Sequence, residues 1–420
     1  MMKAIPLMQF CFIVSVSSQQ IQNDGEIKLW NALGNFGHKL SQKLASSEPR
    51  GNILVSPLSV ATALNMALVG AGGSTKGEMI TSMGLQGIDE LSLRRAFLSI
   101  LSRKHDNPTD PVDPNPRTSF TLLAANRLYI SSRFPTRNEF KTDIAENFLA
   151  EALNVDFLKN GSQIQNEINA FVSERTRGLI KDVLKQPLSP STMLALINTV
   201  YFKGFWTHRM DEVPGSWIFN EGCAELQSQP EKRLMVTSRY KYLDSANLQA
   251  QMILLPYVSD DTVVEMLIML PHEEHKCNTQ AWFERISGEA LRSEIRNMSH
   301  TRVHLTMPAF ELDGRYDLER VLPTMGMPSA FTPGQADFTG ISSQRTNIDK
   351  VIHQSKMIVT RFGTEAAAAT VLAITRFASF PSVEPIPMVV DRSFYVSIIY
   401  RVNRDSETFL PLFTGLVHRI

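Results

Sequence analysis

A short segment from His272 to Cys277 contains the densest cluster of metal-binding residue types in the chain. It holds two histidines, two glutamates and one cysteine within six residues, and imidazole, carboxylate and thiolate groups are ligands of zinc. The segment directly follows Leu270-Pro271 at the end of an apolar run, which is typical of a charged turn. We therefore interpret it as a solvated turn and expect no metal, with a zinc site as the alternative.

A glycine-rich segment from Gly70 to Gly77 superficially resembles a loop that holds a phosphate. Such a loop ends in Gly-Lys-Ser or Gly-Lys-Thr and follows a strand, whereas Thr75 precedes Lys76 here and the pattern before it is helical. We expect a connection between two helices. The sequence contains no Gly-x-Ser-x-Gly elbow, so we assign no catalytic residue and no cofactor, although a triad of distant residues stays open.

The segment from Gly363 to Ile374 is rich in alanine and threonine. Taken alone, the alanine run favours a helix that Thr364 could cap. In a strand, alternate residues would share one face and Glu365 would project from the other. Small side chains in that strand could enter between existing strands without steric cost. Both interpretations fit the composition.

Length and charge limit the class of protein. The 420 residues are 43% hydrophobic, which is enough for a large core in one globular domain. Lys and Arg together number 42, as do Asp and Glu. Because the net charge is zero, we expect no non-specific binding to nucleic acid or to an anionic membrane.

The N-terminus predicts a signal peptide over residues 1–18. A lysine precedes an apolar stretch and then the small residues Ser17 and Ser18. The stretch is shorter than the roughly 20 apolar residues that cross a bilayer. The alternative is an apolar first helix. With the signal peptide, the mature domain would cover residues 19–420 and the protein would be secreted into the extracellular space.

Two cysteines and two glycosylation acceptors would remain in the mature chain. Removal of the signal peptide would take Cys11 with it and leave Cys223 and Cys277, so the protein is not a disulfide scaffold. Asn160 and Asn297 each begin an Asn-x-Ser triplet, which predicts a glycoprotein.

Helical patterns come first along the chain and strand patterns follow. Residues 27–45 have helical periodicity, and Pro57 to Val69 predicts a helix with Ser56 as its cap. The Pro-rich segment 107–117 predicts a loop. Strands are expected at 196–202, 263–270, 303–312 and 394–402. This order predicts an α+β fold.

Five segments in the right order together resemble the serpin family of serine protease inhibitors. They are Asn52 to Ser59, Asn198 to Trp206, the hinge Gly363 to Thr370, Asp391 to Val396, and Leu412 to Gly415. The resemblance covers almost the whole mature chain. It implies a single serpin domain with N-terminal helices, a large central β-sheet A, sheets B and C, and an exposed reactive-centre loop at about residues 363–387.

The resemblance also implies roles for particular residues. The polar shutter and breach of sheet A would contain Ser56, Ser59, Asn198, His353 and Trp206. The hinge would consist of Gly363, Thr364, Glu365, Ala366, Ala367, Ala368, Ala369 and Thr370. A monomeric inhibitor of this type is a suicide substrate: a serine protease cuts its loop, and the loop then inserts into sheet A before the acyl-enzyme is hydrolysed.

The cut bond has two candidate positions one residue apart. The commonest loop length of the family places Phe377 before the cut and Ala378 after it, which predicts a chymotrypsin-like protease. A loop one residue shorter places Arg376 before the cut and predicts a trypsin-like protease. We favour Arg376, because apart from Glu365 it is the only charged residue between Thr364 and Ser382.

Two departures from the family pattern stand out. Members commonly pair a glutamate two residues before the hinge glycine with a lysine on a neighbouring strand, but these positions are Arg361 and Ala309 here. The sheet could therefore open more easily at that end. Phe171 stands where the family usually has tryptophan, and we expect little consequence.

Subgroup and alternative functions are inferred from the same resemblance. The loop is similar to that of clade E, which includes plasminogen activator inhibitors and nexins. There, a basic helix binds glycosaminoglycan, and the heparin-binding candidates here are Arg94, Arg95, Arg103, Lys104 and His105. The alternative is a non-inhibitory serpin that acts as a carrier, chaperone or storage protein. Such hinges contain bulky, charged or proline residues, whereas Thr364 to Thr370 contains only Glu365 of these.

Overall fold

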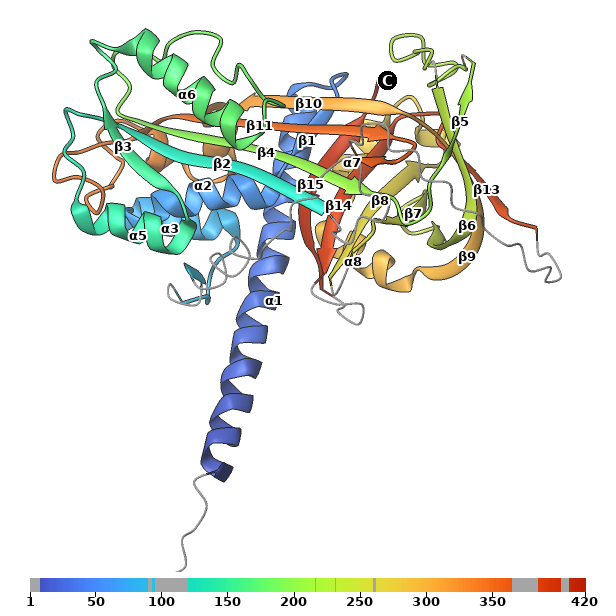
Figure 1. Ribbon diagram of the computed structural model, residues 1–420, viewed down its shortest axis with the longest axis horizontal. Helices are drawn as coiled ribbons and strands as arrows, with labels where there is room; N and C mark the ends of the chain where they lie inside the picture. Colours follow the sequence, from blue (N-terminus) through green and yellow to red (C-terminus); the bar gives the residue numbers. More distant parts are fainter. Residues whose placement is uncertain are drawn as a thin grey trace, which may run out of the picture.

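The computed structural model contains two β-sheets with helices packed around them (Figure 1). It describes residues 8–89, 93–94, 120–215, 217–230, 232–259, 262–364, 384–401 and 408–420. The side chains of residues 8–24, 26 and 121 are not described. The α+β architecture expected from the sequence is confirmed.

The first sheet, sheet A, has six strands among the described residues. Their spatial order is β10 (Phe310–Asp317), β11 (Ile348–Thr360), β12 (Gly363–Thr364), β4 (Leu194–Phe205), β2 (Phe120–Ser131) and β3 (Glu151–Val155). β11 also pairs directly with β4, and this central pair is parallel. A gap between these two strands would therefore divide the sheet.

The second sheet combines the expected sheets B and C. Its described strands run in the order β1 (Ile53–Val55), β15 (Leu410–Val417), β14 (Phe394–Arg401), β8 (Val263–Pro271), β7 (Ala250–Pro256), β6 (Lys232–Ser245), β9 (Ser299–Pro308) and β13 (Ile386–Val389), with β5 (Asp211–Pro214) beside β6. β6 pairs with β7 through its last residues and with β9 over most of its length. This long strand makes the two expected sheets continuous.

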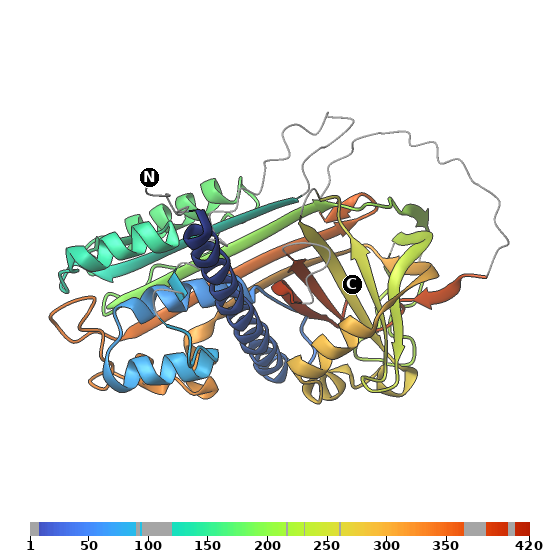
Figure 2. The same ribbon diagram turned by 90° about the horizontal axis from the view of Figure 1, so that it is seen from below.

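Helices cover both faces of sheet A. α6 (Gly161–Arg175) lies on one face, and α2 (Pro57–Val69) and α3 (Gly73–Met83) lie on the other (Figures 1 and 2). The other described elements are α1 (Met8–Ser47), α5 (Asn138–Phe148), α7 (Thr279–Glu284), α8 (Gly288–Asn297), and the 3-10 turns η1 (Glu273–His275), η2 (Leu318–Arg320), η3 (Leu322–Met325) and η4 (Pro328–Phe331).

Two apolar clusters form the core. The larger contains α2 and the interior of the second sheet, and the smaller lies between α6 and sheet A. In the smaller cluster, Ile168 of α6 packs with Ala125 of β2, Ile197 of β4 and Ile352 of β11. Because this cluster includes residues of both β11 and β4, separation of these two strands must alter its contacts.

Several sequence predictions concern local structure. Ser56 caps α2 by accepting a hydrogen bond from the Ser59 amide, and Pro57 takes the first position, as expected. The run 303–312 is divided into β9 and β10 by Ala309. The predicted signal peptide overlaps α1, which continues without a break to Ser47. The loop predicted at 107–117 lies outside the described residues.

The two segments with apparent chemical motifs have structural roles. α2 and α3 are joined through Gly70 to Gly72, and a side chain on Gly72 would meet the Asp337 carboxylate at 2.6 Å. An acidic neighbour there opposes phosphate binding.

In the charged turn, His272 bonds to Asp244 at 2.7 Å and His275 to Gln249 at 2.8 Å. Cys277 is joined to Cys223 in a disulfide that the sequence analysis did not predict.

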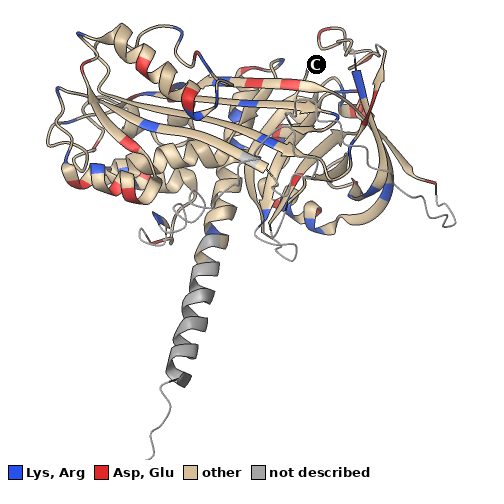
Figure 3. Ribbon diagram, in the orientation of Figure 1, with Lys and Arg blue, Asp and Glu red and all other residues tan. Residues whose placement is uncertain are grey.

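Charge is distributed evenly over the described surface. Basic and acidic residues are both scattered over strands and helices, and many of them form pairs (Figure 3). Among the described helices, none combines the length and the hydropathy needed to span a bilayer.

Candidate functional site

The hinge begins inside sheet A. Ile348 to Lys356 of β11 pairs with β4, and beyond that point β12 lies between the two strands. Gly363 pairs with Thr360 on one side and with Phe205 on the other. A Cβ at Gly363, where φ is +151°, would lie 2.0 Å from the Gly204 carbonyl oxygen. Glycine is therefore required for this close entry.

Thr364 is the first hinge side chain, and it is fully buried. Its hydroxyl oxygen lies 2.6 Å from the hydroxyl of Tyr257, which is also buried. Burial raises the pKa of the Tyr257 phenol well above its usual value, so the phenol stays neutral. Tyr257 in turn stacks on Trp206, with ring centroids 4.4 Å apart. Thr364 is thus held by Tyr257, and Tyr257 is in turn held by its packing against Trp206.

Trp206 also joins the strands around the hinge. Its indole N–H donates to the Thr360 carbonyl at 3.0 Å, and its backbone N–H donates to the Phe362 carbonyl at 3.0 Å. The sequence motif that ends at Trp206 therefore lies at the end of sheet A where β12 enters between β11 and β4.

The departures Arg361 and Ala309 lie at the same end of sheet A. Arg361 is exposed, and the described residues offer it no ion pair; its guanidinium lies 4.8 Å from the Phe362 ring centroid. Arg209 lies 5.6 Å from the same ring. Two cations thus flank Phe362 at the position where the family commonly has an opposite-charge pair.

The shutter residues form one hydrogen-bonded cluster beneath the centre of sheet A, which we call the shutter cluster: Ser56, Ser59, Asn198 and His353. His353 and Asn198 are direct partners across the β11–β4 pair, and their side chains are 2.5 Å apart at Nδ1 and Oδ1. The Asn198 amide donates to the Ser59 carbonyl at 2.8 Å and to its hydroxyl at 2.6 Å. An inserting strand would have to separate His353 from Asn198.

His353 is neutral in this arrangement. Its Nε2 accepts a hydrogen bond from the Ser56 N–H at 3.1 Å, so the proton lies on Nδ1 and is donated to Asn198. Complete burial lowers the pKa of His353 to about 3. A neutral imidazole with both ring nitrogens hydrogen-bonded fits a structural role, which stays a prediction for this residue.

Two contributors to the site were missed in the sequence. Asn126 of β2 is the direct partner of Asn198 on the other side of β4, and its Oδ1 accepts a hydrogen bond from the Asn198 amide. Tyr257 lies far from the hinge in sequence. Strand pairing brings both residues into place, and periodicity alone does not reveal such pairing.

Other predicted site residues lie partly outside the described chain. Undescribed positions are Glu365, Ala366, Ala367, Ala368, Ala369 and Thr370 of the hinge, Arg376, Phe377 and Ala378 of the reactive bond, and Arg95, Arg103, Lys104 and His105 of the heparin candidates. Arg94 is described, and it forms an ion pair with Asp143 at 2.8 Å. Asn160 and Asn297 are both exposed.

Comparison with known proteins places this arrangement in a family. The profile of the family described as Serpin (serine protease inhibitor) matches residues 31–420. "Iripin-8" of Ixodes ricinus is 31% identical over 97% of each chain. "Intracellular coagulation inhibitor 2" of Tachypleus tridentatus is 29% identical, over 93% of this chain and 91% of that protein. A solved structure of human thyroxine-binding globulin in complex with thyroxine is similar in fold, with a TM-score of 0.79 and 24% identity over 94% of this chain and 99% of that one. The chain therefore belongs to the serpin family.

Proposed function

We propose that this protein is a secreted suicide-substrate inhibitor of a serine protease. The observation that carries the proposal is the position of Gly363 and Thr364, which already pair between β11 and β4. The residues that follow have small side chains up to Thr370, apart from Glu365. A cleaved loop could therefore continue the strand that these two residues begin.

The chemistry is supplied by the protease. Its serine oxygen attacks the carbonyl carbon of the loop residue before the cut and forms an ester, while the bond to the next nitrogen breaks and that nitrogen takes a proton. The freed loop then pairs with β11 and β4 and gains ladder hydrogen bonds. Because insertion precedes hydrolysis of the ester, the protease stays bound and the inhibitor is consumed.

Target class is part of the proposal. We place the cut between Arg376 and Phe377, which favours a trypsin-like protease whose pocket binds the guanidinium through charge-assisted hydrogen bonds. Cleavage between Phe377 and Ala378 by a chymotrypsin-like protease is the alternative. Glycosaminoglycan binding by Arg95, Arg103 and Lys104 stays a prediction, and Arg94 contributes less charge because it is paired with Asp143.

Secretion is supported by two features. Cys223 and Cys277 form a disulfide, and such bonds persist in oxidising compartments. The glycosylation candidates Asn160 and Asn297 are exposed and would be accessible for modification. Both features agree with a signal peptide at the N-terminus.

A carrier function is the competing proposal. Thyroxine-binding globulin has the same fold and binds a small molecule, so the fold alone does not imply inhibition. The small hinge side chains favour the inhibitor, because a carrier has no need for a loop that can insert.

Incubation with a panel of serine proteases tests the proposal. We expect an SDS-resistant complex with a trypsin-like protease, and mass spectrometry of the released C-terminal peptide should show a new N-terminus at Phe377. Ala368→Pro provides the control, because proline removes a ladder donor from the inserting strand, and this variant should be cleaved without trapping. Cleavage of the unmodified chain by every protease without a complex would favour the carrier.

A further inference from the structure

A cavity opens beside sheet A at the point where its outermost strand begins. β3 pairs with β2 only from Arg127 to Ser131. Between Phe120 and Asn126, β2 therefore has no described partner strand on the side away from β4. The cavity at this notch has a volume of about 260 Å³, close to the lower limit of roughly 300 Å³ for small-molecule sites.

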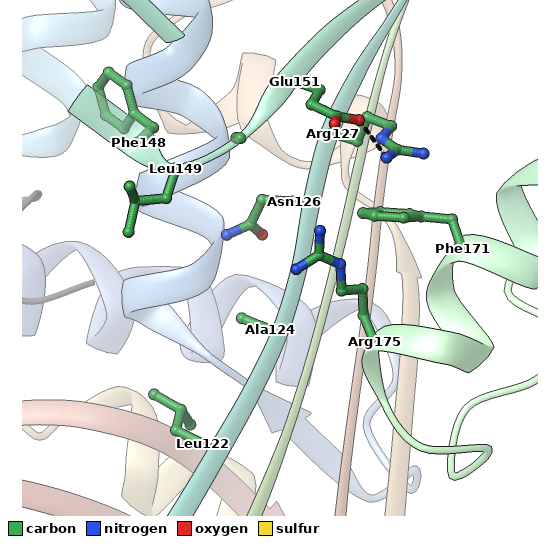
Figure 4. Close-up of a pocket in the computed structure, with 10 residues that line it drawn as sticks. Leu122, Ala124, Asn126, Arg127, Phe148, Leu149, Glu151, Phe171 and Arg175 are labelled. Atoms are coloured by element: carbon green, nitrogen blue, oxygen red, sulfur yellow. Dashed lines mark hydrogen bonds and ion pairs between the residues drawn. The ribbon is translucent and has the colours of Figure 1, made fainter. Parts of the chain in front are cut away.

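One side of the cavity is apolar. Phe148 and Leu149 at the end of α5 lie on one side of β2, and Leu122 and Ala124 come from β2 itself (Figure 4). Leu149 is 60% exposed, so its side chain is accessible to a ligand. Its φ of +51° is the left-handed conformation that ends α5, and it places the side chain at the mouth of the cavity.

The other side of the cavity is cationic. Figure 4 shows the Phe171 ring between the guanidinium groups of Arg127 and Arg175, which lie 3.6 Å and 5.6 Å from its centroid. Glu151 is the acidic residue of the lining, and it pairs with Arg127. Arg175 points toward Asn126, and the described residues give it no ion pair. The lining therefore carries two cations and one carboxylate, and the carboxylate pairs with only one of the cations.

One buried donor in the cavity lining also lacks a well-placed acceptor. The Nε of Arg127 is buried and makes no hydrogen bond of normal geometry among the described residues, although its guanidinium interacts with the buried Tyr129 hydroxyl. A buried guanidinium donor without an acceptor costs free energy that a bound anion would restore. The unpaired Arg175 and this donor are on the same side of the cavity, facing the apolar side chains across β2.

We propose that this cavity binds a small amphipathic organic anion, a monocarboxylate with an apolar tail. The carboxylate would accept hydrogen bonds from Arg175, since guanidinium and carboxylate groups match in geometry. The tail would cover Leu122, Phe148 and Leu149. Neither half of such a ligand matches the cavity alone, because the apolar wall and the cationic wall face each other.

Direct binding to the full-length protein tests this proposal without any protease, so its outcome is separate from that of the inhibitor proposal. Decanoate is the probe, and decanol and inorganic phosphate carry the tail and the anion alone. By calorimetry or ligand-observed NMR, decanoate should bind about tenfold more tightly than either control, because a charge-assisted hydrogen bond and apolar burial each contribute about that factor. Equal binding of decanol or of phosphate, or no binding of decanoate, would overturn the proposal.

Variants locate the ligand. Arg175→Gln should weaken decanoate binding about tenfold, and Leu149→Gln should weaken it severalfold without affecting the core, because Leu149 is largely exposed. Glu151→Gln should tighten binding, since it frees Arg127 for the ligand. Arg285→Gln, at an exposed arginine outside the cavity, is the matched control and should change nothing. Unchanged affinity in Arg175→Gln, or weaker binding in Glu151→Gln, would place decanoate elsewhere.

Discussion

At the centre of sheet A, His353 and Asn198 close the β11–β4 gap with hydrogen bonds between buried polar side chains. At the hinge end, Trp206 and Tyr257 close it with stacked rings, with hydrogen bonds from Trp206 to backbone carbonyls and with one side-chain bond from Tyr257 to Thr364. The strands have already separated at the hinge end to admit β12, but at the centre they still pair directly. We infer that opening starts at the hinge end and is limited at the shutter cluster.

The largest effect is expected from breaking the shutter cluster. Asn198→Ala removes the acceptor of His353 and the donor to Ser59, and it leaves buried polar groups without partners. The native state should lose about 2–4 kcal/mol, measured as a lower urea midpoint of the first unfolding transition. Asn154→Ala removes a hydrogen bond from an exposed asparagine and should cost less than about 0.5 kcal/mol. If the two substitutions lowered the free energy of unfolding equally, the shutter cluster would stabilise the native state no more than one exposed hydrogen bond does.

Acid should weaken the centre more than the hinge end. The pKa of His353 falls from 6.5 to about 3 on folding, so below pH 6.5 the unfolded chain binds a proton that the native chain does not. Stability should therefore decrease from pH 6.5 toward pH 3, by up to about 1.4 kcal/mol per pH unit for one proton.

Burial also lowers the pKa of His38, His418 and His208, the last near the hinge end, so these residues contribute to the slope with the same sign. His353→Gln should reduce the slope, and His300→Gln, at a surface position, should leave it unchanged. A slope that is identical with and without His353 would show that this residue does not carry the effect.

A smaller effect is expected at the hinge end. Tyr257→Phe and Thr364→Val each remove one partner of the buried hydroxyl pair and retain most of the packing. The double variant should be less destabilised than the sum of the two, with a coupling of about 1 kcal/mol. Strict additivity in urea unfolding would mean that the hinge is held by the β12 backbone alone.

The difference between the two regions also explains what could be predicted from sequence. Ser56 and Pro57 begin a helix by local rules, so α2 was predictable, and the shutter cluster was identified from motifs that the family shares. Tyr257 and Asn126 act through strand pairing over long sequence distances, which the sequence pattern does not encode locally. The cavity was missed for the same reason: it brings together the ends of α5 and α6 and the edge of β2, and Phe171 was noted only as a departure from the family pattern.

The smallest effect is expected from restoring the family's ion pair at the hinge end. Phe310 pairs with Val359, so Ala309 and Arg361 lie at the same end of the β10–β11 pair. Arg361→Glu together with Ala309→Lys should slow spontaneous loop insertion, but only modestly, because an exposed ion pair contributes roughly 0–1 kcal/mol.

Arg361→Glu alone should slow insertion part of the way. Arg209 lies against the same Phe362 ring and would meet a carboxylate in place of a second cation. Ala309→Lys alone should not slow it, because it adds a cation beside two others. Native gel electrophoresis at low and high salt measures the rate of conversion to the inserted form. About 1 M salt should abolish the slowing by screening exposed charges. If the double variant converts at the unchanged rate in low salt, then the aromatic pair of Trp206 and Tyr257 closes this end of the sheet without help from charge.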